Sequence, residues 1–387
     1  MRPLGDRAHV SVVYLFYYMA LGAFLPFINL HYRRLGVSAL EIGFLSALLV
    51  PVSAIGSLLW SGIADALGRH RLILVSSMAL SIGAVFVLSQ VRDFPMIVLW
   101  AALQAFVSSP IGPLVDSAAV RVAGRSGSSF GVFRMWGTIG WAIATLVVGT
   151  LVEQFSLGWA FYGYMAFMGL TLVVAWAGGA ARPQRRGAEL WEEMRSVLHH
   201  RSFLVFLGSV FFLGMTLGGE SNFLSLFLDS IGSSETMIGL AWTVGALSEI
   251  PVLWWADRLT KRWGSQGLVK FAFLTFGARW ILLSFVSHPG WALSLQALRG
   301  VSFGAFLVGG VGYTVEVTPA GLSTVALAIF NLTAFTVSSI AGSLLGGYVF
   351  DRFGGAGLFR VLGTAAWIGL LTLVALGERS PSCGHER

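Results

Sequence analysis

Long apolar stretches recur along almost the whole of this chain, and each is long enough to cross a lipid bilayer. A hydrocarbon core about 30 Å thick needs about 20 consecutive apolar residues in a helix. Such stretches lie near residues 9–31, 39–64, 71–91, 95–119, 129–152, 157–180, 202–228, 236–256, 267–287, 289–315, 321–349 and 356–377. The sequence therefore predicts an all-α integral membrane protein with about twelve transmembrane helices.

The composition excludes a water-soluble fold of this length. The 387 residues are 56% hydrophobic and 11% charged, whereas a soluble domain carries about 25% charged residues. The mean hydropathy is +0.78. A core of any size would still need a charged shell in water, so most of the surface must face lipid.

The formal net charge of +7 raises the question of a nucleic-acid partner. The basic residues are distributed unevenly over the loops, with about seventeen on one side and about five on the other if the N-terminus is inside. This asymmetry is typical of cytoplasmic loops. We therefore expect no nucleic-acid partner, and a multi-pass protein of the cell inner membrane with both termini in the cytoplasm.

A polar segment of residues 181–201 divides the apolar stretches into six and six. Its arginines and amphipathic run are typical of a stretch that rests on the anionic inner leaflet. We predict an N-terminal half of residues 1–180, a cytoplasmic linker of residues 181–201, a C-terminal half of residues 202–378 and a cytoplasmic tail of residues 379–387.

A weak internal repeat supports two pseudo-symmetric six-helix bundles. Four residue types recur 196 positions apart, as Gly36, Ser38, Ile42 and Gly43 and again as Gly232, Ser234, Ile238 and Gly239. Farther along, Asp65 of the next loop matches Asp257 at a displacement of 192. A repeat of six-helix units is typical of secondary transporters.

Charged residues inside the apolar stretches are the sharpest indication of a functional site. Each charge at the bilayer centre costs about 2.5–3.5 kcal/mol even on insertion scales. Three are basic and three are acidic, namely Arg134, Arg279, Arg299, Asp116, Glu220 and Glu249. They form either a buried proton-coupling and binding network or a purely structural set of ion pairs. The prolines at positions 110, 113 and 251 are expected to break the helices beside two of the acids.

Three further residues are candidates for a solute cavity. Trp141 follows Arg134 by seven residues, which places an indole and a guanidinium on one helix face. Tyr17 and Asn331 either line the cavity or join helices by hydrogen bonds. For Glu220, an equally open alternative to the buried network is a carboxylate at a helix end, exposed to water.

The loop SGIADALGRHR resembles the signature between the second and third helices of the major facilitator superfamily. Its matching residues are Asp65, Gly68, Arg69 and Arg71, and a second copy contains Asp257 and Arg258. A carboxylate at the membrane boundary can hold a neighbouring helix end in one state of a gate and release it in another. The alternative is a solvated loop with ordinary cytoplasmic arginines.

Several segments together resemble the branch that contains lactose permease and the 3-phenylpropionate transporter. They are LGAFLPFINLHYRRLGVSALEIGFL, FRMWGTIGW, ALSEIP, ARW and LQALRGVSFGAF, in that order over essentially the whole chain. The resemblance implies that five residues of this chain bind the solute or couple its movement to protons. These are Asp116 and Arg134 for sugar binding, Trp141 for stacking, Glu249 for linkage to protonation and Arg279 for deprotonation.

Two positions depart from the branch. Arg299 stands where the group has a histidine, and Ser302 stands where lactose permease has its proton-carrying glutamate. A proton would then be carried by one of the buried acids, and the extra arginine favours an anionic or aromatic carboxylate solute.

The sequence predicts a secondary transporter that takes up a sugar, nucleoside or aromatic acid by proton symport and alternating access. Proton-coupled efflux is the alternative, although the fifth helix lacks the Gly-Pro-rich run usual in efflux members. A membrane-embedded enzyme is a distant third reading, because the histidines lie in loops, tails or near span ends, and no metal cluster or phosphate-binding loop is recognisable. We expect a monomer with no cofactor, driven by the proton gradient.

Overall fold

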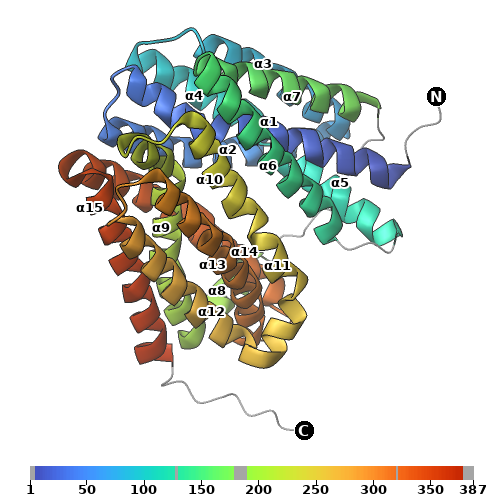
Figure 1. Cartoon of the computed structure of the whole chain (residues 1–387). Coiled ribbons are helices and arrows are strands. Elements are labelled where there is room, and N and C mark those ends of the chain that lie inside the picture. The colour runs from blue at the N-terminus through green and yellow to red at the C-terminus, as the bar shows by residue number, and fades with distance from the viewer. Residues whose placement is uncertain (1–4, 127–129, 178–189, 320, 378–387) are drawn as a thin grey trace. The chain divides into compact units, whose positions relative to one another are not determined.

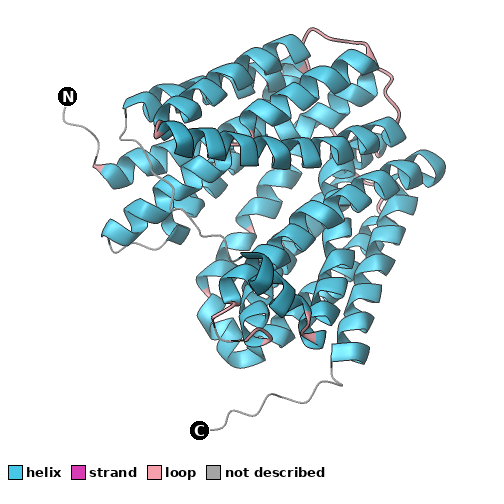
Figure 2. Ribbon diagram, turned by 180° about the vertical axis from the view of Figure 1, so that it is seen from behind, coloured by secondary structure: helices cyan, strands magenta, loops and turns pink. Residues whose placement is uncertain are grey.

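The computed structural model describes residues 5–126, 130–177, 190–319 and 321–377. Over these ranges the chain forms helices joined by short loops and contains no strand (Figure 2). The predicted tail and residues 181–189 of the predicted linker lie outside the described residues. Within the linker, residues 190–198 form a short helix.

The chain folds into two compact units (Figure 1). Unit 1 comprises residues 1–185 and 228–247, and unit 2 comprises residues 186–227 and 248–387. The helices of unit 1 are α1 (Asp6–Arg34), α2 (Ala39–Leu67), α3 (His70–Leu88), α4 (Phe94–Ser108), α5 (Ile111–Ser126), α6 (Phe130–Gln154), α7 (Gly158–Ala177) and α10 (Glu235–Leu247). Unit 2 contains α8 (Leu190–Leu198), most of α9 (Arg201–Ser230), α11 (Glu249–Trp254), α12 (Ala256–Leu283), α13 (Pro289–Glu316), α14 (Ser323–Asn331), the π-helix η1 (Leu332–Val337) and α15 (Ser338–Gly377).

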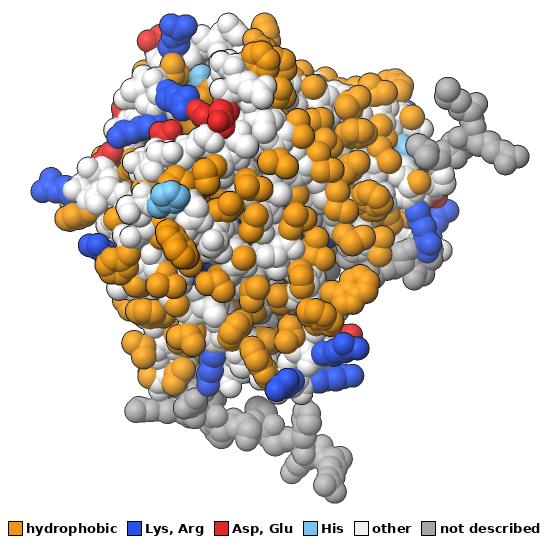
Figure 3. Space-filling model, viewed as in Figure 1, with side chains coloured by type: hydrophobic (Ala, Val, Ile, Leu, Met, Phe, Trp, Pro, Cys, Tyr) orange, Lys and Arg blue, Asp and Glu red, His pale blue; other side chains and the backbone are white. Residues whose placement is uncertain are grey.

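Eleven helical segments of the described chain are long and apolar enough to cross a membrane. The last of them covers 54 residues, Ser323–Leu376, and its backbone bends at Gly354, where φ is +68°. About 20 residues suffice for one crossing, so this segment is long enough for two. The predicted multi-pass, all-helical fold is confirmed. Figure 3 shows hydrophobic side chains over most of the visible face, with charged side chains near its margins.

Two of the predicted helix breaks occur where proline chemistry places them. Proline cannot donate to the carbonyl four residues earlier and its ring collides with that carbonyl. Pro113 therefore interrupts the helix at Ser109, between α4 and α5, and Pro251 interrupts it at Ser248, between α10 and α11. Pro113 lies three residues before Asp116, and the break at Ser248 directly precedes Glu249.

The internal repeat is visible in the backbone at glycines with positive φ. Gly36 and Gly232 have φ of +90° and +81°, and Gly68 and Gly264 have φ of +62° and +69°. Only glycine adopts this region without strain. Gly36, Gly68 and Gly232 follow the ends of helices, and Gly264 interrupts α12. Both pairs are separated by 196 residues, which supports one register for the repeat. Asp257 departs from that register, because it precedes Gly264 by four positions more than Asp65 precedes Gly68.

Small residues bring α1 and α6 together, and this contact positions the candidate site of unit 1. A methyl group at Gly140 would overlap the carbonyl oxygen of Leu15, and one at Gly22 would lie 2.9 Å from the carbonyl oxygen of Trp141. In lipid, such close backbone approach is a main source of helix association.

We expect Gly140→Ala to lower the thermal unfolding midpoint in detergent by several degrees, because the α1 backbone must move to admit the methyl group. Gly169→Ala on α7 is the matched control. A Cβ there meets nothing within 4 Å, so removing a helix-interior glycine is expected to leave the midpoint unchanged or to raise it. Equal midpoints for the two variants would contradict the close packing.

Candidate functional site

Unit 1 joins Asp116 and Arg134 through two stacked tyrosines of α1. The hydroxyl of Tyr14 donates to Asp116 Oδ1, and Arg134 Nη1 donates to the hydroxyl of Tyr18 over 3.1 Å. The two phenol rings are stacked, with centroids 5.9 Å apart and an angle of 12° between their planes. The Arg134 guanidinium also lies 5.9 Å from the centre of the Tyr18 ring. Asp116 and Arg134, which the resemblance assigns to sugar binding, are therefore parts of one network.

The tyrosines at positions 14 and 18 were not among the candidate residues. Their signal in the sequence is the spacing of Tyr14, Tyr17 and Tyr18, which at i, i+3 and i+4 share one helix face. Tyr17, which was predicted, packs edge-on against Tyr18 with ring centroids 5.4 Å apart. Its hydroxyl lies near Gly112 of α5. This aromatic face of α1 is half-buried to buried and carries three hydroxyl groups.

Trp141 is half-buried on α6 and packs edge-on against Trp242 of α10, with ring centroids 6.1 Å apart. One turn away, the hydroxyls of Thr145 and Thr243 are 2.7 Å apart. Thr243 also donates to the carbonyl oxygen of Ala142 over 3.0 Å. The indole proposed to stack on a solute is thus held beside a second indole that the sequence did not single out.

Unit 2 contains a buried charge network around Glu220 of α9. Its Oε1 lies 2.7 Å from Arg279 Nη2 and 3.3 Å from Arg299 Nε. Glu220 and Arg279 are almost completely buried, whereas the Arg299 side chain is 19% exposed. The reading of Glu220 as a helix-end carboxylate in water is therefore wrong. Two guanidinium groups compensate its burial between the helices.

Neighbouring polar groups complete the environment of Arg279. Its Nη2 also donates to Oε1 of Gln296 over 2.9 Å, and its Nε donates to the carbonyl oxygen of Leu295 over 3.2 Å. The fixed guanidinium fork is thereby oriented by groups of α9 and α13. Arg299 lies 5.9 Å from the centre of the Phe303 ring, so an aromatic surface adjoins the partly open arginine.

The remaining predicted residues of unit 2 are Ser302, Glu249 and Asn331. Ser302 is buried and donates to Oγ1 of Thr275 over 2.8 Å, so a neutral hydroxyl pair occupies the expected proton-carrying position. Glu249 begins α11 and its Cγ packs beside Gly304 of α13. Asn331 is exposed at the end of α14, and its amide donates to the carbonyl oxygen of Leu327 on the same helix.

The gating-loop candidates lie at helix junctions. Gly68 ends α2 in the left-handed conformation, and Arg69 directly precedes α3. Asp65 is 3.7 Å from Nε2 of His70, and the guanidinium of Arg71 lies 5.2 Å from the centre of the Trp176 ring. In unit 2, Asp257 and Arg258 are exposed in the first turn of α12.

The side chains of these sites are of types that recognise a polar or aromatic solute. Within the described ranges no group of three or more His, Cys, Asp and Glu side chains is arranged to hold a metal ion. Phenols, guanidinium groups and carboxylates offer donors and acceptors to a polar solute, and the aromatic rings offer apolar faces.

Comparison with known proteins connects this arrangement to a family of transporters. The family described as "MFS_1 like family" matches residues 8–361. The maltose permease of Geobacillus stearothermophilus is 27% identical over 99% of this chain and 98% of its own length. The probable 3-phenylpropionic acid transporter of Escherichia coli is 22% identical over 98% of this chain and 100% of its own.

Two further similar proteins are an efflux pump and a nucleoside transporter. The multi-drug resistance efflux pump PmrA of Streptococcus pneumoniae is 22% identical over 85% of each chain. The crystal structure of the nucleoside transporter NupG superimposes with a TM-score of 0.86 at 14% identity, covering 97% of this chain and 100% of that one. The latter likeness establishes the fold.

Proposed function

The chain belongs to the MFS_1 like family and is a secondary transporter of the major facilitator type, and from this premise we propose that it takes up a small polar or aromatic solute by proton symport. The proposed location is the cell inner membrane, with both termini in the cytoplasm. The proton gradient supplies the driving force, and no cofactor is required.

One observation carries this proposal, namely that each unit holds acidic and basic side chains of one network inside helices that can span a membrane. Asp116 and Arg134 belong to the tyrosine network of unit 1, and Glu220 contacts two arginines in unit 2. Intramembrane charges are costly and are kept where a solute or ion is bound. The proposed solute contacts are Asp116, Arg134, Trp141, Glu249, Tyr17 and Asn331.

The proposed solute classes are sugars, nucleosides and aromatic acids. The names of the two relatives that match along their whole length, a maltose permease and a probable 3-phenylpropionic acid transporter, support the first and the last. The open side of Arg299 beside Phe303 suits a carboxylate attached to an aromatic ring, because the guanidinium binds the acid while the ring packs against the apolar part.

The transport cycle proposed here moves residues 1–180 against residues 202–378 by alternating access. In unit 1, residues 228–247 of the second half pack on α6 of the first. Arg34 is 2.5 Å from Glu235, and Glu153 accepts a hydrogen bond of 3.0 Å from the backbone nitrogen of Thr236. These polar contacts must break when the halves separate at this end.

Proton-coupled efflux is the second candidate, and the similarity to the efflux pump PmrA over 85% of the chain favours it. The two directions differ in how the solute responds to an imposed pH gradient. Symport accumulates solute when the outside is acidic, whereas antiport expels it.

We expect purified protein in liposomes to accumulate one of maltose, a nucleoside or 3-phenylpropionate when the outside is more acidic than the lumen. Radiolabelled uptake with the gradient, without it, and with a protonophore measures coupling. Empty liposomes are the control. Accumulation that survives the protonophore would contradict proton coupling, and solute loss driven by the same gradient would favour efflux.

A further inference from the structure

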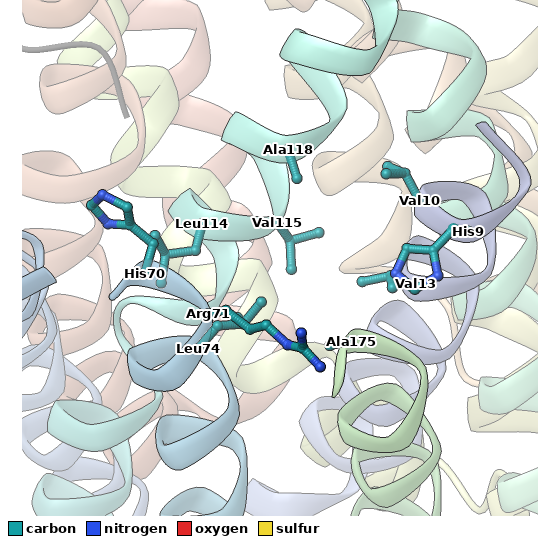
Figure 4. A pocket seen from close by; sticks show the side chains of 10 residues that line it. All are labelled: His9, Val10, Val13, His70, Arg71, Leu74, Leu114, Val115, Ala118 and Ala175. Atoms are coloured by element: carbon teal, nitrogen blue, oxygen red, sulfur yellow. The ribbon is translucent and has the colours of Figure 1, made fainter. Parts of the chain in front are cut away.

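A small pocket in unit 1 lies between the ends of α1, α3, α5 and α7 (Figure 4). Its volume is ≈ 60 Å³. The walls are mostly apolar, and Val115 and Ala118 form one side of them. Figure 4 shows the Arg71 guanidinium extending toward His9 and Ala175. The pocket thus contains one permanently cationic group, the Arg71 guanidinium of α3, among mostly apolar walls.

A groove in unit 2 has the same chemical character. It is lined by Trp263, Gly267, Lys270, Phe271, Leu274 and Leu370, with a volume of ≈ 490 Å³. The Trp263 and Phe271 rings meet edge-on with centroids 5.1 Å apart. One basic side chain therefore stands on an aromatic and aliphatic surface between α12 and α15.

The pocket and the groove share two lining positions in the internal repeat, and their basic side chains lie three residues apart in that register, because the displacement of 196 carries Arg71 onto Gly267. The displacement of 196 that relates Gly68 to Gly264 carries Leu74 onto Lys270. It also carries Ala175 onto Leu371, the neighbour of the groove residue Leu370. Each recess therefore lies where the third helix of a half, just after its left-handed glycine, meets the last helix of that half. Their recurrence indicates a shared feature of the two halves.

The surroundings of both recesses are those of a lipid-facing membrane boundary. Large apolar side chains flank them, with Trp176 58% exposed, Trp263 45% exposed and Leu274 52% exposed. The basic-residue asymmetry assigns these helix ends to the cytoplasmic side. An occupant must carry negative charge at one end and apolar surface at the other, and the inner leaflet supplies molecules of that kind.

Two acids lie near the first pocket, and each contacts a basic residue other than Arg71. Asp65 is 3.7 Å from His70 Nε2, and Asp6 is 3.9 Å from Arg125. Arg71 contacts the face of Trp176 at 5.2 Å, an arrangement that keeps the guanidinium at the boundary between the headgroups and the acyl chains.

We propose that these two recesses, centred on Arg71 and Lys270, each bind the phosphate-bearing headgroup of an anionic phospholipid. The first pocket is large enough for phosphate oxygens but not for an acyl chain, so the chains lie along the exposed apolar faces outside it. This role is separate from the solute site.

Native mass spectrometry of the full chain, released from bilayers of equal phosphatidylglycerol and phosphatidylcholine, tests the proposal. We expect the wild-type protein to retain two phosphatidylglycerol molecules. Arg71→Gln and Lys270→Gln should each lose one, and the double variant should lose both. Arg360→Gln is the matched control, because Arg360 also lies 5.2 Å from an aromatic ring, that of Phe285, but lines neither recess; it should retain two.

The conservative variants Arg71→Lys and Lys270→Arg keep the charge and should retain both lipids, which separates loss of charge from loss of fold. Wild-type protein without preference for phosphatidylglycerol, or a double variant that retains it, would overturn the proposal. Displacement of the lipid by excess inorganic phosphate would assign the recesses to free phosphate instead and would also overturn it.

Discussion

Replacing Arg279 with glutamine is expected to lower the free energy of unfolding by about 3–5 kcal/mol and to abolish transport, because it breaks a buried ion pair by removing one partner. The substitution leaves the buried carboxylate of Glu220 with only the more distant and partly exposed Arg299, at 3.3 Å, to compensate its charge. It also leaves the carbonyl oxygen of Leu295 and the amide of Gln296 without their donor. Thermal unfolding of the purified protein in detergent measures the stability effect.

A double-mutant cycle distinguishes this network from a set of independent contacts. Glu220→Gln combined with Arg279→Gln should cost less than the sum of the two single changes, since the two almost completely buried charges are then removed together and only the partly exposed Arg299 remains charged. Arg34→Gln is the control, because its ion pair with Glu235 is short, at 2.5 Å, but the Arg34 side chain is 48% exposed. Exposed pairs contribute about 0–1 kcal/mol. Additive effects at Glu220 and Arg279 would show that the pair is not coupled.

Arg134→Ala is expected to abolish solute uptake without preventing membrane insertion, and so are Asp116→Asn and Glu249→Gln. Arg134 supplies a charged donor to Tyr18, and Asp116 is the acceptor for Tyr14. Loss of either charge removes one end of the tyrosine network, whereas the α1–α6 packing at Gly140 and Gly22 stays intact. Uptake into liposomes together with the amount of folded protein in the membrane fraction separates function from assembly.

The control for this series is Arg125→Gln in the same unit. Arg125 forms a 3.9 Å ion pair with Asp6, and both side chains are more than 70% exposed. Its removal should leave uptake near the wild-type rate. Wild-type uptake in all three site variants would show that the solute binds elsewhere.

The fold could be predicted from the sequence largely because the bilayer restricts the choices. Length, hydropathy and the absence of a charged shell leave a multi-pass helical bundle as the outcome. Proline chemistry likewise predicted the breaks near Asp116 and Glu249, since the missing backbone donor acts locally. The repeat at Gly36 and Gly232 pointed to the same left-handed turns that the backbone contains.

The partners of the charged residues could not be predicted in the same way. Which side chains meet across helices depends on how each helix is rotated, and a rotation of one residue position changes the partner. Glu220 pairs with Arg279 on a helix about 60 positions later, a distance that no local pattern encodes. The tyrosines that connect Asp116 to Arg134 lie more than 100 positions before them.

The left-handed glycines at positions 68 and 264 have an evolutionary consequence. They share one displacement, yet the helical stretch before the second is four residues longer when counted from the aspartate of each loop. The spacing from Gly36 to Gly68 equals that from Gly232 to Gly264, so the aspartate alone stands four positions earlier in the second copy. One turn of an α-helix contains 3.6 residues, so a shift of four positions keeps a side chain on the same helix face. The two halves of a duplicated gene could therefore move this carboxylate by one turn along the helix without any change in the length of chain between the two glycines.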